Sequence, residues 1–538
     1  MSFGNVVRAW WIGIAAVGAL WAVGYVTWPF SSDQGVLSWV GSIIADGGLP
    51  YRDAWEIRGP FPFLIYAAIS RLFGSAEWPL RVVDLMIVGG GVWCAHRIAH
   101  RLGGTVAARC AAALYVLWYA SLGHHDTAQS DGWNAAMMAA VMVAMLANDG
   151  RPAKRHALIA GVLIGLSILS KPTYAVYLVL PAIVGLGQVR ERGGRWLAEF
   201  WAVGAAALLA AMGSIVLWLY QGGALGAFFD IHLKWLFAHY TNVESSWMNR
   251  AQMTARYLTA DTFATAIAPA LLGLYAVWAR HRLQAALLAA WVVCAIVGVM
   301  AQGAFFAYQW HPLYPGLAVL AGVGIGFVFS AARSRDSVTL VIGTAVAGAA
   351  FVAALLRPLV HVYRAVALAL GLMSQERFDA VEFGPYGRTG PFAQLSSYLR
   401  AHTSPRDRVL VWGLAPGVYY EADRTASTRF GYVTPLITEE NDSFRQRYRR
   451  DFVRQVSAAP PVYVAALSPA VCAKARGLEE RRLIGPVEER LVCIDESPDL
   501  ARLVREHYVP DSSFGAIAVY RRRDRLQQSA GQLPAPNE

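Results

Sequence analysis

Charged residues are scarce in this sequence: they make up 15% of its 538 residues, whereas 56% are hydrophobic. A soluble globular domain carries about 25% charged residues, so the composition excludes an ordinary soluble protein and indicates a membrane protein. Acidic residues are fewer than basic ones: the chain has 36 Asp and Glu and 47 Lys and Arg, which gives a net charge of +11. In a membrane protein this excess reflects topology and contact with anionic lipid rather than nucleic-acid binding.

Cysteine is also rare, with five in the chain. Cys94, Cys110 and Cys294 fall within apolar stretches, where thiols behave as small apolar side chains. Cys472 and Cys493 lie near the C-terminal end, and an oxidising compartment would permit a disulfide between them, a question that the sequence leaves open. Cys-x-x-Cys and histidine-rich metal patterns are lacking. A cleavable signal peptide is not expected, because the first apolar stretch is long and no small-residue cleavage site follows it.

Long apolar runs are abundant over the first two-thirds of the chain. About 20 apolar residues are needed to cross the hydrocarbon core of a bilayer. We therefore expect about eleven transmembrane helices, and a re-entrant or interfacial helix for the shorter run 60–73. The expected spans are 9–29, 79–99, 104–122, 131–148, 156–170, 173–187, 198–220, 262–279, 284–302, 311–331 and 337–360.

The basic residues predict the direction of these spans. With a cytoplasmic N-terminus, the inside connections are all short and basic, as the positive-inside rule requires. Counting 60–73 as a twelfth span would invert every one of them. We expect a bacterial inner-membrane protein whose long loops 30–78 and 221–261, and the whole chain after 360, lie outside the cytoplasm. The inside connections are 100–103, 149–155, 188–197, 280–283 and 332–336.

The C-terminal part has a different pattern. Residues 375–525 lose the long apolar runs and gain strand and turn signals. Their alternation predicts a small extracytoplasmic α/β domain after a transmembrane domain of residues 1–365. The polar residues 526–538 are expected to be disordered. The expected strands are 408–414, 462–467 and 515–523, and the expected helices are 391–402 and 443–458.

Three charged residues on the predicted outer side are candidates for chemistry, since charges at membrane depth need a reason. Asp33 directly follows the first span and suits a general base, although a helix cap or a solvated loop acid is the alternative. Arg58 could hold a phosphate through its fork of donors, or extend to lipid head groups. Lys171, before Pro172, breaks an apolar pair of half-spans and indicates a charge that faces a cavity.

Other polar residues on the same side are candidates for substrate binding. The loop GHHDTAQS (123–130) and the residue after it offer His, Asp and Gln side chains, but too few ligands for a metal site, so an ordinary polar loop is the alternative. The residues around Tyr308 could equally form an aromatic belt at the membrane surface. The substrate-binding candidates are Asp53, Glu56, His125, Asp126, Asp131 and His311.

The order and spacing of these features resemble a known family, the GT-C fold membrane glycosyltransferases of the protein O-mannosyltransferase and lipid A aminoarabinose transferase group. The resemblance covers about residues 10–360 and is best in the first loop. It rests on an acid after the first span, a Tyr-acid-Glu-basic-Pro stretch, a Leu-Phe-Gly…Arg signature, a Leu-x-Lys-Pro break and a late Tyr…Pro-x-x-Pro segment. In this chain the acid is Asp33, and the Tyr-acid-Glu-basic-Pro stretch is Tyr51, Asp53, Glu56, Arg58 and Pro60. The Leu-Phe-Gly…Arg signature is 72–74 and Arg81, and the Leu-x-Lys-Pro break is 169–172. The late segment is Tyr308, Pro312 and Pro315. The tail pattern VWG…YY…TRF is also similar.

The resemblance implies an activity and roles for residues. It implies transfer of a sugar from a polyprenyl-phosphate donor to an envelope lipid, glycan or protein hydroxyl, with Asp33 as catalytic base. Arg58, Lys171 and Tyr308 would stabilise the departing phosphate. Gln34 stands where the family usually has a second acid, which argues against a bridging divalent metal, and no other cofactor is implied.

Two other classes of function remain open from the sequence. A transporter or lipid flippase would show internal repeats and charges in the middle of spans. An envelope-assembly scaffold would use the outer domain to bind a partner and would not need Asp33 or Arg58. Neither repeats nor mid-span charges are evident, so the enzyme is the favoured hypothesis.

Overall fold

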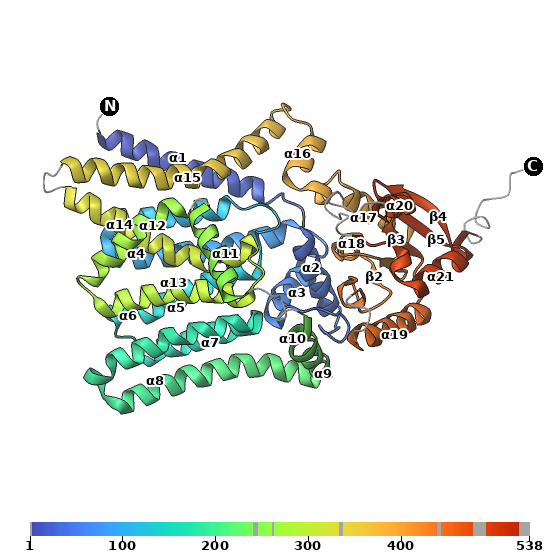
Figure 1. Ribbon diagram of the computed structural model, residues 1–538, viewed down its shortest axis with the longest axis horizontal. Coiled ribbons are helices and arrows are strands. Elements are labelled where there is room, and N and C mark those ends of the chain that lie inside the picture. The colour runs from blue at the N-terminus through green and yellow to red at the C-terminus, as the bar shows by residue number, and fades with distance from the viewer. Residues whose placement is uncertain are drawn as a thin grey trace, which may run out of the picture.

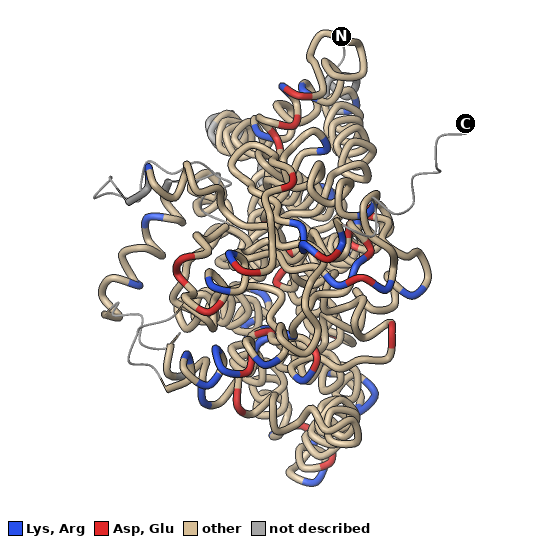
Figure 2. Tube along the Cα trace, turned by 90° about the vertical axis from the view of Figure 1, so that its right-hand side faces the viewer, with Lys and Arg blue, Asp and Glu red and all other residues tan. Residues whose placement is uncertain are grey.

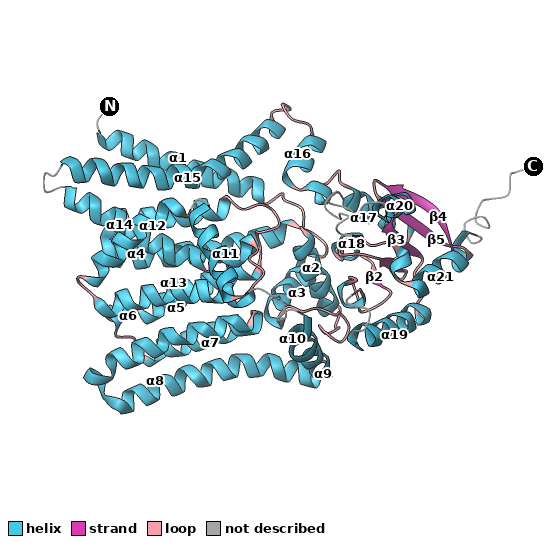
Figure 3. Cartoon of the chain, in the orientation of Figure 1, coloured by secondary structure: helices cyan, strands magenta, loops and turns pink. Residues whose placement is uncertain are grey.

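The computed structural model describes residues 3–239, 246–260, 263–332, 337–437, 443–476 and 491–526. Helices dominate, and the strands gather at one end of the molecule, far from the N-terminus (Figures 1 and 3). The predicted disordered segment 526–538 lies outside these residues except for its first position.

Helices occupy the segments predicted to span the membrane. Five of them are by themselves long and apolar enough to cross a bilayer, and a bent pair of helices would make six. The protein is therefore a multi-pass membrane protein, while the count of eleven stays a prediction. The helices that occupy the predicted spans are α1 (Phe3–Tyr25), α4 (Trp78–Ala120), α5 (Ser130–Met145), α7 (Lys154–Ser170), α8 (Val179–Gln221), α12 (Ala264–Trp278), α13 (Arg282–Gln302), α14 (Leu313–Ala332) and α15 (Ser337–Ala369).

Glycines divide the two longest helices. A straight helix of 43 residues would be roughly 65 Å long, about twice the hydrocarbon thickness. In α4 the backbone leaves helical geometry at Gly104 (φ 77°), and in α8 it does so at Gly193 (φ 82°). A positive φ suits glycine, which lacks a Cβ. Each long helix is thus two helices joined by a tight turn, as the predicted pairs of spans require.

The first loop contains two further helices. α2 (Ser32–Ala45) begins one residue before Asp33, and α3 (Pro60–Phe73) is the short apolar helix expected there. Pro60 begins α3, a position where the missing N–H of proline costs nothing. A chain of short helices lies in the second long loop, comprising α9 (Leu225–Phe229), η2 (Asp230–Trp235), α10 (Leu236–His239) and α11 (Trp247–Ala260).

A five-stranded sheet organises the C-terminal part. Its order is β2-β1-β3-β5-β4, with β1 parallel to β2 and β3 and with β5 antiparallel to β3 and β4. The strands are β1 (Arg408–Val411), β2 (Thr425–Ala426), β3 (Tyr463–Leu467), β4 (Tyr508–Phe514) and β5 (Ile517–Arg522). The helices around them are α16 (Gln375–Glu382), α17 (Pro391–His402), α18 (Gly417–Ala422), α19 (Ser443–Ala458), α20 (Pro469–Arg476) and α21 (Pro498–His507). The structure also joins Cys472 to Cys493 in a disulfide.

The buried apolar residues form two cores. One core lies among the long helices α1, α4, α5, α7 and α12 to α15. The other combines the sheet with residues of α2, α3 and the short helices after α8, including Trp39, Trp55 and Trp235. The first loop therefore folds together with the C-terminal part, and the surface between the two cores holds the candidate site.

Candidate functional site

Asp33 and Arg58 meet in an ion pair. Asp33 lies in the first turn of α2, and Arg58 lies two residues before α3, so the close packing of these two helices brings them together. Arg58 Nη2 is 2.7 Å from Asp33 Oδ1, and Arg58 Nη1 is 2.9 Å from Glu56 Oε1. The Arg58 and Asp33 side chains are 22% and 29% exposed, whereas that of Glu56 is fully buried. Burial opposes the charge of Arg58, but Glu56 and Asp33 together raise the pKa of its guanidinium.

Glu56 is held rigidly behind Arg58. Its Oε1 also accepts hydrogen bonds from the backbone N–H groups of Ile57 (3.0 Å) and Arg58 (3.1 Å). Its Oε2 accepts a hydrogen bond of 3.0 Å from the Tyr432 hydroxyl. Tyr432 belongs to the C-terminal part, so a residue 376 positions away completes the support of Arg58. Sequence reasoning missed Tyr432, because no motif near it in the chain predicts a functional role for its hydroxyl.

Asp126 and Tyr308 lie beside the ion pair. The Asp126 carboxylate accepts a hydrogen bond from the Tyr308 backbone N–H, and burial together with the nearby negative charge of Asp33 raises the pKa of Asp126 to about 6. The Tyr308 hydroxyl is near enough to Arg58 to influence its pKa. The loop 121–129 and the residues before α14 thus converge on α2.

Lys171 forms a second ion pair. Lys171 Nζ is 2.6 Å from Asp131 Oδ2 and 3.0 Å from Gln302 Oε1. Tyr174 donates a hydrogen bond of 3.2 Å to Asp131 Oδ1. The ammonium also lies 5.3 Å from the centre of the Tyr308 ring, a cation–π contact. Tyr308 is therefore in contact with Lys171 through its ring and with Asp126 through its backbone, and it is near enough to Arg58 to affect the charge there.

The two candidate histidines differ in burial. His125 is exposed, and its ring lies 5.4 Å from that of Tyr386. His311 is buried near Lys171. Within the described ranges, neither ring nitrogen of His311 has a hydrogen-bond partner.

The structure places Asp53 away from the ion pair. Its carboxylate accepts a hydrogen bond from the backbone N–H of Leu49 (2.8 Å) and forms a salt bridge with Arg52 (2.7 Å). These contacts fix the turn before Trp55. These contacts stabilise the loop that carries Arg58, and among the residues that the structure describes they do not reach the Asp33 cluster.

Gln34, which replaces the acid usual in the resembling family, forms hydrogen bonds through both its side-chain nitrogen and its side-chain oxygen. Its Nε2 donates to the carbonyls of His124 (2.9 Å) and Thr127 (2.6 Å). Its Oε1 accepts from Ser31 N (3.0 Å) and Arg81 Nη2 (2.6 Å). A carboxylate at this position would face two carbonyl oxygens without a proton to donate. The amide therefore positions the 123–130 loop next to Asp33.

A buried carboxylate in α4 supports the same loop and was not predicted. Asp84 accepts hydrogen bonds from Tyr25 (2.7 Å), Tyr119 (2.6 Å) and Trp133 (2.9 Å). The Tyr119 hydroxyl in turn accepts from the backbone N–H of Ala128 (3.1 Å). Buried polar groups need such partners to offset desolvation. An Asp inside an apolar run was the only sequence signal for this network.

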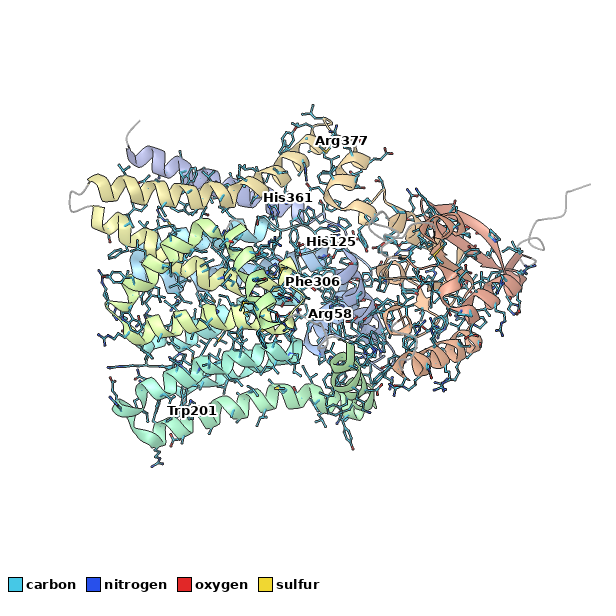
Figure 4. All side chains as sticks on the ribbon, viewed as in Figure 1. Arg58, His125, Trp201, Phe306, His361 and Arg377 are labelled. Atoms are coloured by element: carbon cyan, nitrogen blue, oxygen red, sulfur yellow. A yellow bond between two sulfur atoms is a disulfide. The ribbon has the colours of Figure 1, made fainter. Side chains whose placement is uncertain are left out.

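The cluster lies where the helices meet the sheet-containing part. In Figure 4, Arg58, His125 and Phe306 lie together in the middle of the molecule, and Trp201 of α8 lies far from them. Among the residues that the structure describes, no group of three His, Cys, Asp or Glu could hold a metal ion.

A basic groove of about 630 Å³ opens beside the loop that carries Arg58. It lies between η2 and α19, and five cations outnumber two acids along it. Figure 2 shows Lys and Arg segments interspersed with Asp and Glu over this end of the molecule. Its charged residues are Lys234, Arg429, Arg447, Arg450, Arg454, Asp230 and Asp451.

Comparisons with known proteins agree with this architecture. Residues 58–219 match the family described as dolichyl-phosphate-mannose-protein mannosyltransferase. Among solved structures, ArnT from Cupriavidus metallidurans bound to undecaprenyl phosphate has a TM-score of 0.60 at 16% identity, covering 97% of this chain and 98% of that chain. The apo state of the same protein has a TM-score of 0.57 at 15% identity, covering 96% and 98%. A search of curated proteins finds no match.

The structural likeness, at this level of identity, shows the fold: the chain has the GT-C fold over nearly its whole length, including the C-terminal part. The resemblance predicted from the sequence, to GT-C glycosyltransferases of the protein mannosyltransferase and ArnT type, is confirmed by both comparisons.

Proposed function

We propose that this protein transfers a sugar from a polyprenyl-phosphate donor to a hydroxyl acceptor, with the donor phosphate held at Arg58. The observation that carries the proposal is the Asp33–Arg58–Glu56 cluster, in which a carboxylate and a guanidinium are in contact at a partly exposed position. The likeness to ArnT bound to undecaprenyl phosphate supports the class of donor.

The chemistry is a single displacement at the anomeric carbon of the donor. The acceptor oxygen forms a new bond to this carbon while the bond from the carbon to the phosphate oxygen breaks. The acceptor proton passes to Asp33, and the electron pair leaves with the phosphate. Arg58 offsets the charge that develops on the leaving phosphate, and a positioned cation of this kind supplies much of the rate in phosphate-releasing reactions.

Arg58 links phosphate binding to proton transfer, because Asp33 is paired with its Nη2. A donor phosphate that took this nitrogen would release an Asp33 oxygen for the acceptor hydroxyl. Glu56, fixed by Tyr432 and two backbone N–H groups, would keep the guanidinium in place during this exchange. We assign Glu56 and Tyr432 as positioning residues.

Lys171 and Tyr308 form the second part of the proposed donor site. Lys171 is 21% exposed and already balanced by buried Asp131, so it can face a phosphate without a large net charge. Tyr308 contacts Lys171 through its ring and would lie over the phosphate. Asp126, His125 and His311 surround this space and would contact the sugar or the acceptor, while Asp131 orients Lys171.

The membrane placement supports a lipid-linked donor. The basic inside connections predicted from the sequence assign the Asp33 side to the outer face of a bacterial inner membrane. Nucleotide sugars are cytosolic, whereas a polyprenyl-phosphate sugar reaches this face through the bilayer. The acceptor would be an envelope lipid, glycan or protein hydroxyl, and the C-terminal residues 375–525 would lie outside the cytoplasm above the transmembrane residues 1–365.

A donor screen tests the proposal. The purified full-length protein would be incubated with bacterial envelope extract and either polyprenyl-phosphate sugars or nucleotide sugars, and donor consumption followed by mass spectrometry. We expect release of polyprenyl phosphate from at least one lipid-linked sugar and no consumption of nucleotide sugars. Consumption of nucleotide sugars alone would contradict the proposal.

A further inference from the structure

A cavity of about 880 Å³ lies at the end of the helix bundle opposite to the candidate site. It is formed by α4, α7 and the C-terminal end of α5, with Gln284 of α13 at one edge. α4 begins at Trp78 beside the site and lines the cavity roughly 22 to 36 Å further along its axis, at 1.5 Å per residue. α5 and α7 likewise have one end near Asp131 and Lys171 and the other end at the cavity. The cavity therefore lies about one bilayer thickness from the site.

The polar lining of this cavity is basic. Three arginines and three histidines face it, and the lining residues, all of which the structure describes, include no Asp or Glu. Asp149 is the nearest acid in this turn, and it pairs with Arg101 at 2.8 Å while its side chain is 82% exposed. Three arginines against this one acid leave a net charge of +2 even when all the histidines are neutral. The basic residues are His96, Arg97, His100, Arg101, Arg155 and His156.

Apolar side chains also line the cavity. Val143 and Ala144 of α5 line it, and Ile159 of α7 and Trp93 of α4 are large apolar side chains that are 42% and 57% exposed. Arg97 lies over the Trp93 ring at 5.4 Å, so a cation and an aromatic ring stand at the same edge. Trp at such a position is typical of the membrane–water interface. A cavity lined by both cations and apolar side chains matches a molecule with an anionic head and a hydrocarbon chain.

We propose that this cavity binds the head group of an anionic phospholipid from the leaflet opposite to the candidate site, with one acyl chain along Val143 and Ile159. Basic pockets between transmembrane helices recognise phosphate-bearing lipid head groups in this way. Basic residues that only set the orientation of the chain in the membrane need not surround a cavity. Here the cations surround a cavity that also has apolar lining residues, which favours a binding site. The proposal does not depend on sugar transfer, because the cavity lies at the other end of the helices.

Lipid retention tests this proposal. The full-length protein would be purified in detergent, mixed with phosphatidylglycerol or with phosphatidylcholine, and measured by native mass spectrometry. We expect phosphatidylglycerol to be retained in preference to phosphatidylcholine. The triple variant Arg97→Gln, Arg101→Gln, Arg155→Gln should bind phosphatidylglycerol roughly 100-fold more weakly, since each cation near the surface strengthens anionic-lipid binding about fivefold.

A matched control removes the same number of charges outside the cavity. Arg190, Arg280 and Arg282 are exposed residues on the same predicted side, and their replacement by Gln should leave lipid retention unchanged. The single variant Arg97→Glu covers the case in which the triple variant fails to fold, because the described contact of Arg97 is with Trp93. Equal losses in the cavity and control triples, no preference for phosphatidylglycerol, or full displacement of the lipid by inorganic phosphate would each overturn the proposal.

Discussion

At the residue scale, the candidate site depends on one guanidinium shared between two carboxylates. Arg58 can serve both because Asp33 binds one of its terminal nitrogens and Glu56 the other. The two acids differ in accessibility, since Glu56 is buried and fully hydrogen-bonded whereas Asp33 is partly exposed. This difference agrees with the proposed roles, in which Glu56 positions Arg58 and Asp33 is the acid that the acceptor reaches.

Replacement of Tyr432 by Phe tests the support of Glu56. The change removes the hydrogen bond to Glu56 Oε2 and leaves this oxygen buried without that donor. We expect the free energy of unfolding to fall by about 1–3 kcal/mol, which is the usual cost of a buried polar group that loses its partner. Thermal unfolding in detergent measures this, with Tyr363→Phe at an exposed position as control. Equal midpoints for the two variants would contradict the assignment.

Asp126 should make stability depend on pH. Its pKa is raised from 3.8 to about 6, first by burial and also by the charge of Asp33, so the native state holds this proton more tightly than the unfolded state does. Stability therefore falls as pH rises from about 4 to about 6 and then levels off, at a total cost on the order of 3 kcal/mol. Asp126→Asn should raise the thermal midpoint at pH 7 and flatten this slope. An unchanged slope in the variant, relative to Asp46→Asn, would show that another group titrates there.

Sequence reasoning predicted most of the charged residues that the structure brings together in the candidate site, and it missed the neutral residue Tyr432 beside them. Asp33, Arg58 and Lys171 were recognisable because a charge near an apolar run is costly and therefore informative. Asp53 was chosen for its spacing, but its contacts stabilise the local turn. Tyr432 could not be found, because its role depends on a contact between residues 376 positions apart.

At the element scale, α2 is the helix that joins the two halves of the protein. A Cβ added at Gly35 would lie 2.8 Å from the Cα of Gly417, so the backbones of α2 and α18 are in contact. A Cβ at Gly431 would lie 2.5 Å from the ring of Trp39, also on α2. The Tyr420 hydroxyl donates to the carbonyl of Gly74 at the end of α3 (2.5 Å). Small residues thus allow the C-terminal part to approach α2 next to Asp33.

Gly35→Ala should separate α2 from α18. Its methyl group would overlap backbone atoms that cannot move aside as a side chain could, and overpacking of this kind costs about 1–3 kcal/mol. We expect a lower thermal midpoint and, because Gly35 is two residues from Asp33, a lower transfer rate as well. Gly13→Ala in α1, where a Cβ meets nothing within 4 Å, is the matched control. The idea fails if both variants behave as the wild type does.

The helices and strands of the C-terminal part that were predicted have a clear sequence pattern, whereas the missed strand β4 does not. The helices α17 and α19 were predicted at their observed bounds, because both have amphipathic periodicity. The strands β1, β3 and β5 were found through their runs of β-branched and aromatic residues. β4 was missed because it contains Pro510, Asp511 and two serines, which read as a loop. An edge strand tolerates proline, since one of its sides needs no ladder hydrogen bonds.

At the scale of the whole molecule, the first loop packs against both the short helices after α8 and the C-terminal part. The loop 49–58 packs on both sides, because Trp55 contacts Trp235 of η2 and Tyr432 of the C-terminal part. Arg429 donates to the carbonyl of Tyr51 (3.1 Å), and its own carbonyl accepts from Trp55 N (2.7 Å). The loop that carries Arg58 is therefore held by contacts with both parts.

The orientation of the chain in the membrane gives a prediction at this scale. Asp46→Cys, at the exposed C-terminal end of α2, should react with a membrane-impermeant maleimide in cells whose outer membrane has been permeabilised. Arg190→Cys should react only after the inner membrane is disrupted. Among the described residues, the native cysteines are buried or paired in a disulfide, so the background should be low. The reverse pattern would place Asp33 in the cytoplasm and contradict the proposed donor.

The central claim is that Asp33 takes the acceptor proton in a transfer from a lipid-linked sugar. It is tested most directly by the rate at which purified Asp33→Asn releases polyprenyl phosphate, compared with Asp46→Asn, an exposed acid at the other end of the same helix. Asparagine keeps the size of the side chain but cannot act as a base, so we expect a rate roughly 100- to 10,000-fold lower, with Asp46→Asn close to wild type. A wild-type rate in Asp33→Asn would contradict the claim.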